Sequence, residues 1–333
     1  MRAVGLYRYL PIDNPESLLD VEVETPAASG RDLLVEVKAV SVNPVDTKRR
    51  APKDLVEKTP KILGWDAAGV VKAAGPDCVL FKPGDPVYYA GSVIRQGANS
   101  EFHLVDERIV GRKPANLSFA EAAALPLTTL TAWELLFERM GISKSGAQAG
   151  RSLLVLGGAG GVGSIAIQLA KKLAKLEVTA SASRPESIAW CKSLGADETV
   201  DHSKPLEGTE YDYVLCLSST DSYWNTFPKI TRPQGRIGII VRPAKPVDLA
   251  ILNDKSIAVC LEGMFTRSTF QTPDMEAQHL LLDEAAGLVE AGVLKGTLAQ
   301  NLGKINAANL RRAHKMLEEG HVIGKLVLEG WGS

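Results

Sequence analysis

The chain has 333 residues, which is more than one ordinary hydrophobic core accommodates, so we expect two domains. Hydrophobic residues make up 45% of the chain and charged residues 23%, which is typical of soluble globular proteins. A formal net charge of -1 excludes a general electrostatic attraction to nucleic acids or anionic membranes, and we expect neither as a partner.

The first third of the chain has the pattern of β structure. Residues 33–42 alternate apolar and polar side chains, and the apolar pieces 69–71 and 86–89 follow, separated by the turn residues 82–85. Many short strands between glycines and prolines predict a small barrel or sandwich. From residue 120 to 140 the chain is apolar and rich in alanine, which predicts two helices with a break near Pro126.

After Arg151 the predicted elements alternate. We expect strands at 153–156, 177–182, 213–217, 236–241 and 257–261, and helices at 164–175 and from Pro185 onward. Strands that alternate with helices need right-handed crossovers and form a parallel, doubly wound sheet. The tail predicts helices at 274–292 and 307–319 and a strand at 324–329, which extends the parallel sheet or returns to the first domain.

The strongest motif is a glycine loop between the strand at 153–156 and the helix that follows it. Gly158, Gly160 and Gly163 fit G-x-G-x-x-G, with Ala159, Gly161 and Val162 between them. We expect Gly158 to allow a tight turn, Gly160 to let the backbone approach a pyrophosphate, and Gly163 to let the helix pack closely. The alternative is a glycine-rich turn without a ligand.

The residues after the second strand of this unit indicate which dinucleotide binds. Enzymes that use NAD usually carry a carboxylate there, which binds the ribose 2′-hydroxyl. This chain carries Ser183 and Arg184, and an arginine pairs well with a 2′-phosphate. We therefore predict NADPH, although Arg184 is also compatible with a solvated helix start.

Several motifs resemble the medium-chain dehydrogenase/reductase superfamily, in particular its quinone oxidoreductase branch and the zinc-type alcohol dehydrogenase-like proteins. They lie at residues 43–46 (NPVD), 64–70 (GWDAAGV), 83–85 (PGD), 124–128 (ALPLT), in the glycine loop and at 324–328 (GKLVL). The resemblance implies a GroES-like β-rich domain at 1–125 and 270–333, a Rossmann NADPH-binding domain at 126–269, and a cleft between them. It also implies a homodimer formed through Rossmann edge strands.

The same resemblance predicts that zinc is absent. Zinc-dependent relatives carry a cysteine and a histidine at positions that correspond to Asp46 and Trp65 here. An indole cannot ligate zinc, and a catalytic zinc site needs three protein ligands. The four cysteines, Cys78, Cys191, Cys216 and Cys260, are far apart and form no structural zinc lobe.

The remaining candidate residues rest on the resemblance, and each has a structural alternative. Asn43 would donate a hydrogen bond to a substrate carbonyl or form a turn before Pro44, and Asp46 would orient Asn43, relay a proton or cap a helix. Trp65, Tyr89 and Phe265 would contact a flat substrate or simply pack. Thr128 is expected to contact the nicotinamide of the cofactor. Other cofactor contacts are expected from Ser218, Met264, Phe265 and Lys325. The alternative for Lys325 is a solvated lysine.

These features predict a zinc-free, NADPH-dependent reductase that transfers hydride to a quinone or an α,β-unsaturated carbonyl. Two alternatives stay open, a zinc alcohol dehydrogenase with unusual ligands and a non-catalytic NADPH-binding sensor. The N-terminus lacks the apolar run of a signal peptide, and no stretch is long enough to span a bilayer, so a cytoplasmic location is expected.

Overall fold

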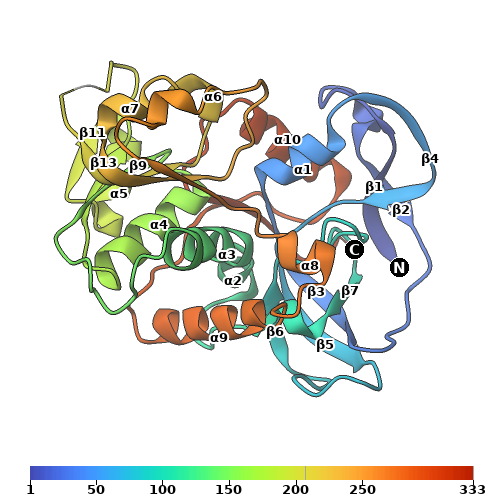
Figure 1. The fold of residues 1–333 in the computed structure, drawn as a ribbon. Helices are drawn as coiled ribbons and strands as arrows, with labels where there is room; N and C mark the ends of the chain where they lie inside the picture. Colours follow the sequence, from blue (N-terminus) through green and yellow to red (C-terminus); the bar gives the residue numbers. More distant parts are fainter. Residues whose placement is uncertain (207, 333) are drawn as a thin grey trace. The chain divides into compact units, whose positions relative to one another are not determined.

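The computed structural model describes residues 1–206 and 208–332, and it divides into two compact units (Figure 1). One unit comprises Met1–Leu127 and Phe265–Ser333, and the other comprises Thr128–Met264. The predicted domains divide the chain after residues 125 and 269, whereas the structure divides it after residues 127 and 264.

The second unit contains a six-stranded sheet in the order β11-β10-β9-β12-β13-β14, and every pairing in it is parallel. Its strands are β9 (Ser152–Leu156), β10 (Glu177–Ser181), β11 (Glu198–Val200), β12 (Tyr211–Cys216), β13 (Thr231–Ile239) and β14 (Ala258–Leu261). Its helices are η3 (Glu134–Arg139), α4 (Gly161–Lys172), α5 (Pro185–Leu194), α6 (Thr220–Tyr223), α7 (Phe227–Ile230) and η4 (Ala250–Leu252). This is the doubly wound parallel sheet that the alternating pattern predicts.

Strand β9 lies at the centre of this sheet because its side chains are apolar on both faces. Leu154 and Leu156 pack in a buried cluster with Phe227 and Ile230 of α7, and α4 contacts β9 and β10. The strand order reverses at β9: the next strand in sequence, β10, lies on one side of it, and β12 lies on the other. Their carboxyl ends therefore form the topological switch point at which such sheets bind ligands.

The first unit is built on a seven-stranded sheet and a three-stranded sheet. The larger sheet has the order β15-β16-β3-β5-β6-β8, with β7 paired to β3, and the smaller has the order β2-β1-β4. The strands are β1 (Arg2–Tyr9), β2 (Leu19–Glu22), β3 (Asp32–Val42), β4 (Lys53–Ile62), β5 (Ala67–Ala74), β6 (Pro86–Tyr89), β7 (Phe102–Asp106), β8 (Val110–Arg112), β15 (Leu298–Asn301) and β16 (Lys325–Glu329). The predicted β-rich domain is thus present.

Seven helices surround these strands among the residues described. They are η1 (Pro15–Ser17), α1 (Pro44–Arg50), η2 (Glu107–Ile109), α2 (Phe119–Ala123), α8 (Thr266–Phe270), α9 (Ala277–Glu290) and α10 (Ala307–Glu318), and α3 (Pro126–Trp133) crosses the boundary between the units. Strand β16 pairs antiparallel with β3, with Leu326 opposite Val42. The final strand therefore returns to the first unit, which was the second of the two alternatives above.

The structure corrects the predicted bounds of several helices, among them α9, which spans Ala277–Glu290 and not 274–292. Helix α4 begins at Gly161 and ends at Lys172, whereas the predicted helix spans 164–175, because the glycines that open it form its first turn. The break near Pro126 is present, and α3 continues into a π-helical turn, η3, which apolar periodicity does not reveal. No helix within residues 1–206 and 208–332 combines the length and apolar character that crossing a bilayer requires.

Candidate active site

The glycine loop joins β9 to α4, as its sequence predicts, and its glycines have different structural roles. The left-handed residue is Gly157, with φ 87°, and the backbone N–H of Gly157 donates to Ser181 Oγ over 2.9 Å. Gly158 lies inside the tight turn, as predicted, because the N–H of Gly160 donates to the carbonyl oxygen of Gly157 over 3.2 Å, but the positive φ is at Gly157. A Cβ on Gly158 would lie 2.8 Å from the Cβ of Ala180 and 3.2 Å from Cys191 Sγ, so Gly158 is needed for packing against β10 and α5.

Gly160 and Gly163 differ in what surrounds them. A Cβ on Gly163 would lie 2.3 Å from the carbonyl oxygen of Gly157, so only glycine fits there. A Cβ on Gly160 would meet only that oxygen, at 3.5 Å, and Gly160 has an ordinary φ of -72°. The space beside Gly160 is open, next to the first N–H groups of α4, which have no acceptor within the helix and point toward any bound anion.

Three further residues predicted to hold the cofactor, Ser183, Arg184 and Ser218, lie at the carboxyl edge of the same sheet. Ser183 and Arg184 follow β10 and are exposed, and Arg184 precedes α5 as its N-cap residue. Ser218 follows β12 and is exposed; a Cβ on Gly157 would lie 3.9 Å from the Cβ of Ser218. The loop residues Gly157, Ala159, Gly160, Gly161 and Val162 are half-buried. The second unit thus brings the predicted phosphate loop, Arg184 and Ser218 to one edge.

Thr128 and Met264 are buried in the second unit, Thr128 in α3 and Met264 after β14. Their predicted contacts with the nicotinamide stay predictions. Sequence reasoning missed Ser181, the last residue of β10, whose hydroxyl accepts the N–H of Gly157.

The first unit places Asn43, Asp46, Asp66 and Lys325 in one buried cluster, and no more than 3% of any of these residues is exposed. Asn43 follows β3 and precedes α1, Asp66 precedes β5, and Lys325 begins β16. The side chain of Asn43 donates from Nδ2 to Asp66 Oδ2 over 2.9 Å, and Asn43 Oδ1 accepts a hydrogen bond from Lys325 Nζ. Asn43 is therefore held on both sides of its carboxamide.

Asp66 is the acceptor on which this cluster converges. Its Oδ2 accepts from Lys325 Nζ over 2.9 Å, and its Oδ1 accepts from the backbone N–H of Leu127 in the first turn of α3 over 2.8 Å. Burial raises the pKa of Asp66, and the positive charge of Lys325 and the donors around it oppose that rise. Sequence reasoning did not select Asp66; the signal was a carboxylate within the apolar run 64–71.

Asp46 lies in the first turn of α1, where its Oδ2 accepts the backbone N–H of Asn43 over 2.7 Å. Its other carboxyl oxygen, Oδ1, is buried without a hydrogen-bond partner among the described residues. Burial raises the pKa of Asp46 to about 7, against the opposing effects of the Asn43 N–H and Lys325. Asp46 can therefore hold a proton near neutral pH.

Lys325 does not lie on the surface, so the alternative of a solvated lysine is wrong. Its ammonium donates to Val42 O over 3.1 Å, to Asn43 and to Asp66, which are as many acceptors as an ammonium has protons. The prediction that Lys325 binds a cofactor phosphate or ribose is at odds with this geometry, because no proton is left for such a ligand.

The aromatic residues predicted to contact the substrate are packed. Trp65 donates from Nε1 to Ser92 O over 3.0 Å, and its ring meets Phe265 edge-on, with 6.4 Å between centroids. Tyr89 stacks on His103, with 5.5 Å between centroids and 3.1 Å between Tyr89 Oη and His103 Nδ1. Burial lowers the pKa of His103 to about 4, so this histidine is neutral.

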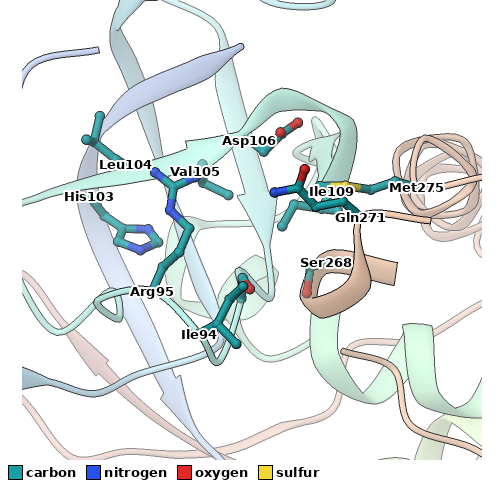
Figure 2. Close-up of a pocket in the computed structure, with 11 residues that line it drawn as sticks. Ile94, Arg95, His103, Leu104, Val105, Asp106, Ile109, Ser268, Gln271 and Met275 are labelled. Carbon is teal, nitrogen blue, oxygen red and sulfur yellow. The ribbon is translucent and has the colours of Figure 1, made fainter. Parts of the chain in front are cut away.

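Figure 2 shows a cavity of the first unit that lies beside His103 and is lined also by Arg95, Asp106 and Ser268. Its volume of about 40 Å³ accommodates a few water molecules and is far too small for a quinone ring. Arg95 is in addition held by both carboxyl oxygens of Asp32, at 2.7 and 2.8 Å. This cavity is therefore not a substrate pocket.

The donor set of the cluster does not fit catalytic zinc. Trp65 offers an indole that already donates to Ser92, and Asp66 is engaged by Lys325, a cation that a metal would have to displace. Within residues 1–206 and 208–332 no group of three or more His, Cys, Asp or Glu side chains is placed to hold a metal ion. The phosphate loop, in contrast, fits a dinucleotide, because it leaves open space beside Gly160 at a helix N-terminus.

Comparison with known proteins identifies the family. The alcohol dehydrogenase GroES-like domain matches residues 29–133, and the zinc-binding dehydrogenase domain matches residues 194–328. A zinc-type alcohol dehydrogenase-like protein of Staphylococcus aureus strain COL is 41% identical, over 98% of this chain and 99% of its own. The NADPH-dependent alkenal/one oxidoreductase of Arabidopsis thaliana chloroplasts is 37% identical, over 93% of this chain and 75% of its own.

Solved structures have the same fold. A protein of Rhizobium etli CFN 42, described as a zinc-dependent alcohol dehydrogenase, is 49% identical with a TM-score of 0.95, over 100% of this chain and 99% of its own. Escherichia coli quinone oxidoreductase, solved in complex with NADPH, is 26% identical with a TM-score of 0.83. The match covers 99% of this chain and 100% of that protein. The chain therefore belongs to the medium-chain dehydrogenase/reductase superfamily, among the zinc-type alcohol dehydrogenase-like proteins and alongside the quinone oxidoreductases.

Proposed function

We propose that this protein is an NADPH-dependent reductase that transfers hydride to a quinone or an α,β-unsaturated carbonyl without zinc. The observation that carries the proposal is the buried Asp66–Lys325 ion pair beside Asn43 and Asp46, where zinc-dependent relatives would hold a metal. This cluster offers hydrogen-bond donors and a proton, which suit an electron-poor acceptor, but no Lewis acid that would ionise an alcohol.

The cofactor would be held by the second unit. The loop Gly158–Gly163 would receive the pyrophosphate at the N-terminus of α4, and Ser183 and Arg184 would bind the 2′-phosphate. The names of two similar proteins support NADPH, the plant alkenal/one oxidoreductase and the Escherichia coli enzyme solved with it. Ser218, Met264, Phe265 and Thr128 would complete the nucleotide and nicotinamide contacts. Bound NADPH supplies a hydride for the β-carbon of an enone or for a quinone.

The chain's own residues would supply the other requirements of the reaction. As hydride adds to an enone, the electron pair of its double bond moves toward the carbonyl oxygen, where negative charge develops. The second N–H of Asn43, which its contacts with Asp66 and Lys325 leave unused, would donate to that oxygen. The proton that completes the product would come from the carboxyl group of Asp46, whose raised pKa lets it hold a proton near neutral pH.

We do not assign a stacking role to the aromatic residues Trp65, Tyr89 and Phe265. Because Trp65 and Tyr89 are buried, they would shape the site by their packing rather than sandwich a ring. Two copies of the chain would associate through the edge strand β14 of the parallel sheet, where Leu261 is 68% exposed.

Steady-state NADPH oxidation with a panel of quinones and enones tests the proposal, together with elemental analysis of the same protein. We expect turnover with at least one acceptor and no stoichiometric zinc. Zinc that chelators remove together with alcohol oxidation would identify a zinc alcohol dehydrogenase instead. Tight NADPH binding without turnover of any acceptor would identify a non-catalytic sensor.

A further inference from the structure

The ion pair between Lys325 and Asp66 is enclosed to an unusual degree. The Lys325 side chain is 3% exposed and that of Asp66 0%, at a separation of 2.9 Å. Burying two charges costs more than their mutual attraction returns in many proteins, and apolar residues of equal volume often stabilise a fold better. The pair therefore calls for a role other than stability.

The contacts of the pair decide which way the carboxamide of Asn43 faces. An ammonium only donates hydrogen bonds, so the group of Asn43 that lies against Lys325 must be the oxygen, Oδ1. The ionised Asp66 only accepts, so the group that lies against Asp66 must be the nitrogen, Nδ2. A flipped amide would place two donors together and two acceptors together.

Backbone groups also hold Lys325 and Asp66 in place. Lys325 also donates to the carbonyl of Val42, the residue before Asn43, and Leu326 is paired with Val42 in the sheet. Asp66 also accepts from Leu127 at the start of α3. Neither partner of Asn43 can turn away without breaking a second contact.

We propose that Lys325 and Asp66 are positioning residues for the reductase reaction, which lock the Asn43 carboxamide in the one orientation that presents an N–H to the substrate oxygen. This inference rests on the proposed function, since it assigns a role in the same reaction. It also reassigns Lys325, which would act from within the first unit and not by contact with the cofactor.

The Lys325→Met variant tests the inference in the full-length protein. Methionine is close in length to lysine but cannot donate, so Asn43 Oδ1 loses its donor and the carboxamide is held by Asp66 alone. We expect kcat with the best acceptor to fall about 10²-fold, as for other lost transition-state donors, with the Kd for NADPH unchanged by fluorescence titration. Asp66→Asn, which keeps the shape but can present either amide atom, should give a similar loss of kcat.

Arg50→Met is the matched control. Arg50 is 1% exposed and pairs with Glu318 in the same unit, but no contact of that pair reaches Asn43. We expect Arg50→Met to lower the melting temperature while leaving kcat unchanged. If Lys325→Met does not fold, Asp66→Asn carries the test alone. In the Asn43→Ala background, Lys325→Met should cause no further loss of kcat, since the residue that it positions is gone.

The outcomes separate the inference from the function on which it rests. A wild-type protein that reduces no quinone or enone overturns both. A wild-type protein that turns over, with unchanged kcat in Lys325→Met and Asp66→Asn, overturns the positioning role and leaves the function in place. A rise in the Kd for NADPH in Lys325→Met makes Lys325 a cofactor residue and overturns the inference as well.

Discussion

Gly163 stands so close to Gly157 that a Cβ at residue 163 would lie 2.3 Å from the Gly157 carbonyl oxygen. Real Cβ atoms do not approach backbone oxygen that closely, so any side chain at 163 must displace the loop or the helix. Gly160, three residues earlier, has room for a methyl group, with 3.5 Å to the same oxygen. Substitution of Gly163 should therefore affect the stability of the loop, whereas substitution of Gly160 should affect phosphate binding.

We predict that Gly160→Ala keeps the melting temperature of the wild type but raises the Kd for NADPH at least about 10-fold, because its methyl group occupies the space intended for the pyrophosphate. Gly163→Ala should lower the melting temperature by several degrees, at about 1–3 kcal/mol for an overpacked site. Differential scanning fluorimetry and fluorescence titration measure the two effects. A Gly160→Ala variant that binds NADPH as tightly as the wild type would contradict the phosphate-loop assignment.

Arg184 is predicted to select NADPH over NADH. Arg184→Ala removes the cation next to the 2′-phosphate and should raise the Kd for NADPH about 10- to 100-fold, while the Kd for NADH, which lacks that phosphate, stays the same. Lys192→Ala on the same helix, α5, is the control, because Lys192 is paired with Asp197 O and Glu198 at the other end. Equal weakening of both nucleotides would show that Arg184 does not read the 2′-phosphate.

Asp46 gives the reaction a pH dependence. Because burial raises the pKa of Asp46 to about 7, the proton-holding form is lost as the pH rises through that value. The value of kcat should accordingly fall above about pH 7, and Asp46→Asn, which holds no transferable proton, should be slow and flat between pH 6 and 8. Stopped-flow NADPH oxidation over this range measures the profile. A wild-type kcat that does not change across it would remove Asp46 from the proton path.

A second buried carboxyl group, that of Glu262, should make the free energy of unfolding of the parallel-sheet unit depend on pH. Glu262 follows β14 and accepts from Arg139 Nε over 2.9 Å, and its pKa is raised from 4.5 to about 8, first by burial and then by the charge of Glu134. Between these values the folded chain keeps a proton that the unfolded chain has released. The free energy of unfolding should therefore fall as the pH rises from 4.5 through 8.

Glu262→Gln, which stays neutral, should flatten that alkaline loss in urea unfolding measured at pH 6 and pH 9. Glu290→Gln is the comparison, because Glu290 is a partly exposed carboxylate of the other unit with an ordinary surface pair to Arg112. A Glu262→Gln variant that loses as much stability as the wild type between the two pH values would place the coupled proton elsewhere.

Local sequence signals predicted most of the fold. The apolar residues of β9, the glycines and the amphipathic α4 are neighbours along the chain, so their order alone indicates a dinucleotide loop. The positive φ of Gly157 was not predicted, because G-x-G-x-x-G does not reveal which glycine adopts it. The π-helical turn η3 was also missed, since its residues continue the helical composition of α3.

The cluster around Asn43 could not be derived from the sequence in the same way. Lys325 and Asp66 are separated by 259 residues, and nothing near either one indicates the other. Only the antiparallel pairing of β16 with β3 brings Lys325 beside Val42 and Asn43. A lysine at the start of an apolar strand resembles a solvated end residue until the fold shows that it is enclosed.

The most direct test of the account is single-turnover transfer from NADPH that carries deuterium at the nicotinamide C4 position, with an α,β-unsaturated ketone as acceptor and zinc-free protein. We predict that deuterium appears at the β-carbon of the product, that NADPH oxidation shows a primary isotope effect, and that added chelator changes neither. NADPH that stays reduced with every enone and quinone, in a protein that regains redox activity only with added zinc, would contradict it.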